Sequence, residues 1–247
     1  MSVEMLQPVT MNSTTPPSRD VVERIVREIV SGMTVPGTAA GQANESRAGD
    51  VIVNVSARHI HLSDKHVEIL FGAGHTLTPM KRLYQEGFFA AEETLMVVGP
   101  RKRMLPNVRV LGPTRPDTQI ELAYTDAVQL GLDIPVRHSG DIAGTPGCVL
   151  VGPQGAVNLE EGVIRAARHV HMSVSDLERL DVANGEMMEL RVTTDDCSMI
   201  FEDVKVRASE GIKLEVHIDT DEANACNISN ASKLELLKVD KCKCEDH

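Results

Sequence analysis

Two kinds of hydrophobic pattern divide the chain into an N-terminal helix and a longer region of strands. In residues 20–33 aliphatic side chains recur at i, i+1, i+4, i+5, i+8 and i+9, with charged residues opposite. This spacing predicts an amphipathic helix. Residues 34–50 are small, polar and glycine-bearing, the composition of a linker. We therefore expect a tethered docking helix; a helix packed on the body is the alternative.

From residue 51 onward short aliphatic runs alternate with turn residues. Three of the runs end at a Gly-Pro pair, and such punctuation at close intervals favours β-strands in a barrel or sandwich. Ser63 and Ser173 have the position of N-caps, and Ser173-x-x-Asp176 has capping-box spacing. The predicted strands include residues 51–55, 94–98, 108–111 and 148–151, and the predicted helices are residues 63–71 and 173–180.

One heptad occurs twice in this region. Residues 57–63 read Ala-Arg-His-Ile-His-Leu-Ser, and residues 167–173 read Ala-Arg-His-Val-His-Met-Ser. Each copy precedes a short helix, a hairpin and a strand-like segment that leads to a Thr-Asp pair. This order predicts a mainly β fold, a tandem pair of similar small β-barrel domains with short helices. The predicted parts are the N-terminal helix and linker (1–50), the first barrel (51–150), the second barrel (151–230) and a C-terminal tail (231–247).

The histidines of the heptads have the spacing of metal ligands. Side chains at i and i+2 of a strand point to one face, so each His-x-His offers two imidazoles to one ion. Catalytic zinc has three protein ligands and an open position, so each half needs one ligand more. In the second half this is His217, and aligning the Thr-Asp pairs places its counterpart at Leu122, next to Glu121. The predicted groups are His59, His61 and Glu121, and His169, His171 and His217; iron, cobalt or nickel also fit them.

Composition and charge narrow the range of functions. The 247 residues carry a net charge of -11 and include no Trp, two Tyr and four Phe. These values argue against nucleic-acid binding, which favours basic surfaces and stacking rings. No stretch approaches the roughly 18 apolar residues of a membrane span, and the N-terminus lacks the pattern of a secretory signal. The five cysteines, an odd number, fit a reducing interior, so we expect an intracellular protein.

Seven stretches of the chain resemble the phosphate propanoyltransferases, or PduL-type phosphotransacylases. They include V-S-A-R-H-I-H-L-S, N-V-R-V-L-G-P-T-R, H-S-G-D-I-A-G-T-P-G and V-H-I-D-T-D-E-A-N-A, and together they span residues 51–227. The resemblance implies a tandem β-barrel fold with two zinc ions, held by the two groups named above. It also implies transfer of a propanoyl or acetyl group between coenzyme A (CoA) and phosphate, with acyl phosphate as the other acyl compound.

The resemblance also implies roles for individual residues. Arg115 corresponds to the phosphate-binding arginine of the family, and Ser139 is a second candidate for phosphate binding or a turn residue. Arg58 and Arg168 alternate to the face opposite the histidines and are expected to form structural ion pairs. Because no Ser-His-Asp set or activated cysteine stands out, direct attack by phosphate is favoured over an acyl-enzyme. The family's CoA contacts fall on Val55, Ser56, Ala57, Lys102, Arg109 and Asn224, where Lys102 and Arg109 with Arg101 and Arg103 would form a basic patch.

Residues 20–33 resemble the N-terminal helix that directs family members into bacterial microcompartments. This implies contact with the shell or with other lumenal enzymes, and a place in the microcompartment lumen or otherwise the cytoplasm. We expect a homodimer or larger homo-oligomer, with neither nucleic acid nor membrane as a partner. Two other functions stay open: a dinuclear zinc acyl-CoA hydrolase that needs no phosphate, and a non-catalytic protein with structural zinc. Structural zinc usually has four ligands, so three per group favour catalysis.

Overall fold

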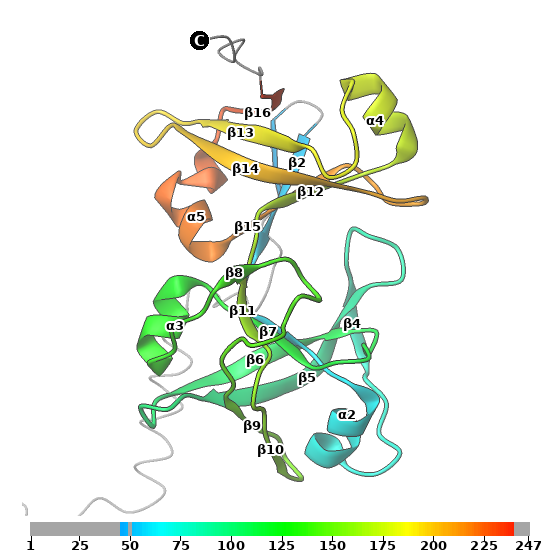
Figure 1. Ribbon diagram of the computed structural model, residues 1–247, viewed down its shortest axis with the longest axis vertical. Coiled ribbons are helices and arrows are strands. Elements are labelled where there is room, and N and C mark those ends of the chain that lie inside the picture. The colour runs from blue at the N-terminus through cyan, green and yellow to red at the C-terminus, as the bar shows by residue number, and fades with distance from the viewer. Residues whose placement is uncertain (1–44, 49–50, 240–247) are drawn as a thin grey trace, which may run out of the picture. The chain divides into compact units, whose positions relative to one another are not determined.

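The computed structural model describes residues 45–48 and 51–239, and this part is built mainly from strands in two curled sheets (Figure 1). The seven-stranded sheet has the order β1-β2-β15-β12-β14-β13-β16. Its strands are β1 (Glu45–Ala48), β2 (Val51–Ser56), β12 (His169–Met172), β13 (Met187–Thr193), β14 (Met199–Ala208), β15 (Glu215–Asp219) and β16 (Lys233–Lys238). The predicted N-terminal helix, residues 20–33, lies outside the described residues, as do the last eight residues of the chain.

The nine-stranded sheet has the order β10-β9-β5-β6-β3-β7-β11-β8, with β4 beside β5. Its strands are β3 (His59–His61), β4 (Pro79–Arg82), β5 (Phe89–Val98), β6 (Met104–Gly112), β7 (Gln119–Glu121), β8 (Val136–Arg137), β9 (Val149–Val151), β10 (Ala156–Asn158) and β11 (Val163–Ala166). The helices are α2 (Asp64–Phe71), α3 (Tyr124–Leu130), α4 (Val174–Leu180), α5 (Thr220–Ala225) and the 3-10 turn η1 (Ile228–Asn230). The predicted mainly β fold with two similar sheet-based halves and short helices is confirmed.

The predicted helix starts agree with the structure. Ser63 caps α2 by accepting a hydrogen bond from the His66 amide, and Ser173 and Asp176 form the capping box of α4. Helices α3 and α5 were not predicted. The strand-like segment expected to lead to the first Thr-Asp pair, Thr125-Asp126, is strand only to Glu121, and α3 follows it from Tyr124.

The duplicated heptad marks the two places where the chain passes from one sheet to the other. The first Ala-Arg pair, residues 57–58, connects β2 of the seven-stranded sheet to β3 of the nine-stranded sheet. The second, residues 167–168, connects β11 of the nine-stranded sheet to β12 of the seven-stranded sheet. The sheets therefore exchange segments, and the predicted domain boundaries, drawn along the sequence, stay a prediction. Within the segment assigned to the C-terminal tail, β16 pairs with β13.

Each sheet covers its own aliphatic core. In β12, Val170 and Met172 are fully buried and pack with β14 and β15, while the alternating histidines face the other side. Ile60 has the same place in β3 and the core of the nine-stranded sheet. A fully buried aliphatic side chain contributes ~1.5–3 kcal/mol, so these positions help to hold the histidine strands in register.

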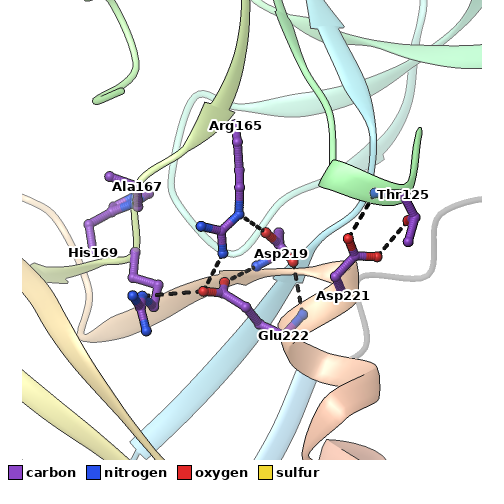
Figure 2. Close-up of polar contacts among 8 residues, drawn as sticks. Thr125, Arg165, Ala167, His169, Asp219, Asp221 and Glu222 are labelled. Carbon is purple, nitrogen blue, oxygen red and sulfur yellow. Dashed lines mark hydrogen bonds and ion pairs between the residues drawn. The ribbon is translucent and has the colours of Figure 1, made fainter. Parts of the chain in front are cut away.

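The arginines of the heptads form the expected ion pairs with the helices that follow the third-ligand strands. Arg58 Nη1 lies 2.9 Å from Asp126 Oδ1 in α3, and Arg168 Nε lies 3.2 Å from Glu222 Oε1 in α5. Asp221 of α5 also accepts the amide hydrogen of Thr125 at 3.0 Å and its hydroxyl hydrogen at 2.6 Å (Figure 2). Because the N-cap of α3 is Ala123, without a capping side chain, Asp221 caps this helix from the other half.

Candidate active site

The structure brings together both predicted groups of metal ligands. Within each group the ligand atoms lie within 4.8 Å of one another, and both groups could hold a metal ion. His59 and His61 lie on β3 and Glu121 on β7; His169 and His171 lie on β12 and His217 on β15. The strand registers place His59 opposite Glu121 and His169 opposite His217. Glu121 itself, not Leu122, is therefore the counterpart of His217, and the alignment of the Thr-Asp pairs was wrong by one residue.

The backbone of each heptad fixes the ring of its first histidine. His59 Nδ1 lies 2.8 Å from the Ala57 carbonyl oxygen, and His169 Nδ1 lies 2.9 Å from the Ala167 carbonyl oxygen. A carbonyl oxygen only accepts, so Nδ1 donates its hydrogen and the lone pair stays on Nε2. This is the usual outer contact of a metal-binding histidine, and the crossover residue provides it in both halves.

In the first group, burial and neighbouring charges shift the pKa values of His61 and Glu121 strongly. Burial, followed by the charge of His59, lowers the pKa of His61 to about 2. Burial acts oppositely on Glu121, yet nearby His59 outweighs it and holds the pKa of this carboxyl below its usual range. His59 Nε2 lies 3.5 Å from Glu121 Oε2 and 3.2 Å from His61 Nε2. An ionised carboxylate thus converges with two ring nitrogens in a buried place, which suits a divalent cation.

Two of the three imidazoles in the second group have strongly lowered pKa values. Burial and the charge of His217 lower the pKa of His169 to about 3 and that of His171 to about 4. Neutral imidazole is the form that binds metal. His171 Nδ1 is a buried side-chain nitrogen without a hydrogen-bond partner in the described part of the chain. The residues of this group, too, fit a divalent metal ion.

The two residues predicted to bind phosphate lie together beside the first group. Arg115 Nη1 donates to Ser139 Oγ at 2.8 Å. Gln119 Nε2 donates to the same oxygen at 2.9 Å and to Glu121 Oε1 at 2.7 Å. Although burial lowers the pKa of Arg115, an arginine guanidinium stays charged. A cation that can receive phosphate is therefore connected by hydrogen bonds to a candidate metal ligand.

Sequence reasoning did not identify Gln119 and two cations on β14 as site residues. Lys205 lies opposite His169 and Arg207 opposite His171 in the register of β12 and β14. The Arg207 charge is among the causes, after burial, that lower the pKa of Arg115. The alternation of side chains along the strand was the available signal. Val206, between these two cations, is buried in the core, so Lys205 and Arg207 lie on the other face of the sheet, as the histidines do.

The two groups share one small cavity. Glu121 of the first group and His169 and His217 of the second line it, together with Ser56 and Ala167. His169 is also among the neighbours that contribute to the lowered pKa of Glu121. The two groups of candidate metal ligands are therefore direct neighbours.

Comparisons with known proteins agree with this arrangement. The family model described as phosphate propanoyltransferase matches residues 52–229. A phosphate propanoyltransferase of Planctopirus limnophila is 51% identical over 230 residues, covering 92% of this chain and 94% of that protein. Those of Thermotoga maritima and Salmonella typhimurium are 47% and 46% identical, covering 76% of this chain and 89% and 88% of theirs. The chain belongs to the phosphate propanoyltransferase family. It is therefore an acyltransferase.

Four of the six positions at which the family resemblance implies contact with CoA lie on neighbouring elements. Val55 and Ser56 end β2, and Ala57 follows them as an exposed residue of the first crossover. Helix α5 contacts β2 and carries Asn224, which is exposed. These residues border the strand that contributes Ser56 to the shared cavity.

The two basic positions of the CoA set lie further apart. Lys102 is exposed in the turn between β5 and β6, whereas Arg109 lies opposite His59. Seven residues of extended chain separate positions by roughly 20 Å, so Arg109 does not extend the patch formed by Arg101, Lys102 and Arg103. Arg109 Nη1 donates to the carbonyl oxygens of Ala91 at 3.0 Å and Glu92 at 2.8 Å.

Among the described helices, none has the length and apolar character of a membrane-crossing segment.

Proposed function

We propose that the enzyme catalyses the reversible reaction of an acyl-CoA with phosphate, which gives acyl phosphate and CoA, at a pair of zinc ions. The acyl-CoA is propanoyl-CoA or acetyl-CoA. The observation that carries this proposal is the hydrogen-bonded path from Arg115 through Ser139 and Gln119 to Glu121. It couples an arginine suited to phosphate with a metal-binding group. A hydrolase or a structural metal site has no need of such an arginine.

In the reaction an oxygen of phosphate attacks the thioester carbon, a C–O bond forms, and the C–S bond breaks. The sulfur leaves with the bonding electrons as the thiolate of CoA, which takes up a proton. Arg115 presents a planar fork of N–H donors to phosphate oxygens, and Ser139 and Gln119 fix its orientation. Zinc, when bound, supplies Lewis acidity for the carbonyl oxygen and the leaving sulfur.

Direct attack by phosphate is favoured because the two buried cysteines of the described residues, Cys148 and Cys226, are poor nucleophiles. Burial raises the pKa of the Cys148 thiol to about 12 and raises that of Cys226. A thiol reacts as its thiolate, so neither residue is poised to take the acyl group. In our proposal CoA contacts Val55, Ser56, Ala57, Lys102, Arg109 and Asn224 in the orientation that brings its thioester to the shared cavity.

The first experiment measures CoA release from propanoyl-CoA and acetyl-CoA, with and without phosphate, on metal-loaded and on chelated protein. Release that requires both phosphate and metal, with acyl phosphate trapped by hydroxylamine, supports the transferase. Release in the absence of phosphate favours the hydrolase. Absence of release from protein with verified metal content favours a structural role for the metal.

Replacing Arg115 with alanine is expected to raise the KM for phosphate or lower turnover while leaving the metal content unchanged. Hydrogen bonds to charged groups contribute about 1.5–3 kcal/mol, so kcat/KM for phosphate should fall by about 10- to 150-fold. Arg191→Ala removes an exposed arginine from β13 and is the matched control. Normal phosphate kinetics in Arg115→Ala would contradict the assigned role.

We further propose that residues 20–33 bind the shell or other lumenal enzymes of a microcompartment. Fusing residues 1–50 to a fluorescent protein should give punctate fluorescence in cells that make compartments. A fusion with charged residues in place of the apolar stripe is the control. Diffuse fluorescence of the unmodified fusion argues against this location. The homo-oligomeric assembly stays a prediction.

A further inference from the structure

Glu121 and His217, the third ligands of the two groups, are each contacted by a buried polar residue two positions before them in the same strand. In the registers, Gln119 lies opposite His61 and Glu215 lies opposite His171, so the two residues occupy equivalent places. Gln119 is 2% exposed and Glu215 is 1% exposed. Residues at i and i+2 of a strand share a face, which brings each of them beside the ligand that follows.

The hydrogen bonds of these two contacts run in opposite directions, and in each the direction suits the chemistry of the ligand side chain. Gln119 Nε2 donates to Glu121 Oε1 at 2.7 Å, where the ligand is a carboxylate that only accepts. Glu215 Oε2 lies 3.0 Å from His217 Nε2, where the ligand is an imidazole that can donate. A glutamine thus accompanies the carboxylate ligand, and a glutamate accompanies the histidine ligand.

The surroundings of Glu215 fix its role as an acceptor. Asn54 Nδ2 lies 2.9 Å from Oε1, and Gln85 Nε2 lies 2.8 Å from Oε2. The amide of Gln85 has a defined orientation, because its oxygen accepts from the Lys213 amide at 3.1 Å and its nitrogen donates to the Lys213 carbonyl at 3.0 Å. The carboxylate therefore faces two side-chain donors besides His217.

This arrangement specifies which nitrogen of His217 is free. An ionised carboxylate has no hydrogen to donate, so the contact requires the hydrogen on His217 Nε2 and leaves the lone pair on Nδ1. In His169 the contact with Ala167 leaves the lone pair on Nε2 instead. His169 and His217 thus offer different ring nitrogens to a metal ion. The Ala167 carbonyl fixes His169 through Nδ1, and the Glu215 carboxylate fixes His217 through Nε2.

We propose that Gln119 and Glu215 are the positioning residues of the two metal groups: Gln119 orients Glu121 by donating to it, and Glu215 selects Nδ1 of His217 as the ligand atom by accepting the hydrogen of Nε2. The inference rests on the proposed dinuclear metal site. Outer partners of this kind typically change metal affinity 10- to 100-fold.

The test compares zinc affinity, by chelator competition, in two variants that remove the polar contact. Glu215→Leu is expected to weaken one of the two zinc ions at least tenfold, and Glu215→Gln, which retains an acceptor oxygen, to restore most of the affinity. Gln119→Leu should weaken the other ion. The assignment is checked in single-site backgrounds: Glu215→Leu should act in His59→Ala protein and have no effect in His169→Ala protein.

Glu93→Leu is the matched control. Glu93 is also a buried carboxylate beside a histidine, with Oε1 2.8 Å from His75 Nε2, but it lies outside both metal groups. It should lose stability without changing the affinity for either zinc ion. Equal zinc affinities in Glu215→Leu and Glu93→Leu would overturn the proposal for the second group.

A measurement on the unaltered protein does not depend on how the variants fold. Nitrogen-15 NMR of the zinc-loaded enzyme should show His217 with a hydrogen on Nε2 and zinc on Nδ1. Zinc on Nε2 of His217 would overturn the inference and leave the proposed function intact. Failure of the unaltered protein to bind two zinc ions would overturn both.

Discussion

His169→Ala is expected to lose one of two zinc ions per chain and to lower kcat/KM at least about 1,000-fold. Such a loss corresponds to about 4 kcal/mol of transition-state stabilisation, a reasonable effect for a metal ion that polarises a carbonyl and stabilises a leaving thiolate. The side chain lies opposite His217 and lines the cavity shared with Glu121, so its removal affects the place where both groups meet.

His59→Ala should have the same effect through the first group, because His59 Nε2 converges with His61 Nε2 and Glu121. His75→Ala is the control: His75 is paired with Glu93 and belongs to neither group. Metal content by atomic emission and CoA release at saturating phosphate are measured on the same samples. Two zinc ions and normal turnover in His169→Ala would remove the basis for the second site.

The ligands could be predicted from the sequence because the information for them is local and occurs twice. A His-x-His on a strand determines the common face of its two rings without knowledge of the neighbouring strands. The third ligands depend on strand pairing, and here the alignment of the Thr-Asp pairs was one residue off. Thr125 is equivalent to Asp221, not Thr220, and it hydrogen-bonds to Asp221.

Other features depend on contacts between distant segments and could not be predicted from local spacing. The short helix α3 begins after an alanine, because Asp221 of the other half provides its cap. The exchange of segments between the sheets could not be predicted from local sequence either, since β2 pairs with β15 some 160 residues later in the chain. Glu215 and Gln85, which are 130 residues apart, contact each other for the same reason.

Glu222→Ala is expected to cost about 3–5 kcal/mol of unfolding free energy, the typical effect of removing one partner from a buried ionic network. Glu222 of α5 contacts Arg165 of β11 and Arg168 of the second crossover, and its other oxygen accepts the amide hydrogen of Asp219 at 2.8 Å (Figure 2). Its side chain is 9% exposed, and that of Arg165 is 12% exposed. Removing the carboxylate leaves a buried guanidinium with one anionic partner, Asp219.

Equilibrium urea unfolding of metal-free protein measures this effect without a contribution from zinc binding. Glu210→Ala removes an exposed glutamate and should change stability by no more than about 0.5 kcal/mol. Glu222→Gln keeps the shape and an acceptor while removing the charge, so an intermediate loss would separate the charge from the packing. A loss in Glu222→Ala no larger than in Glu210→Ala would mean that solvent replaces the carboxylate. Because Asp219 follows His217 by two residues, this network lies next to the second group in the chain.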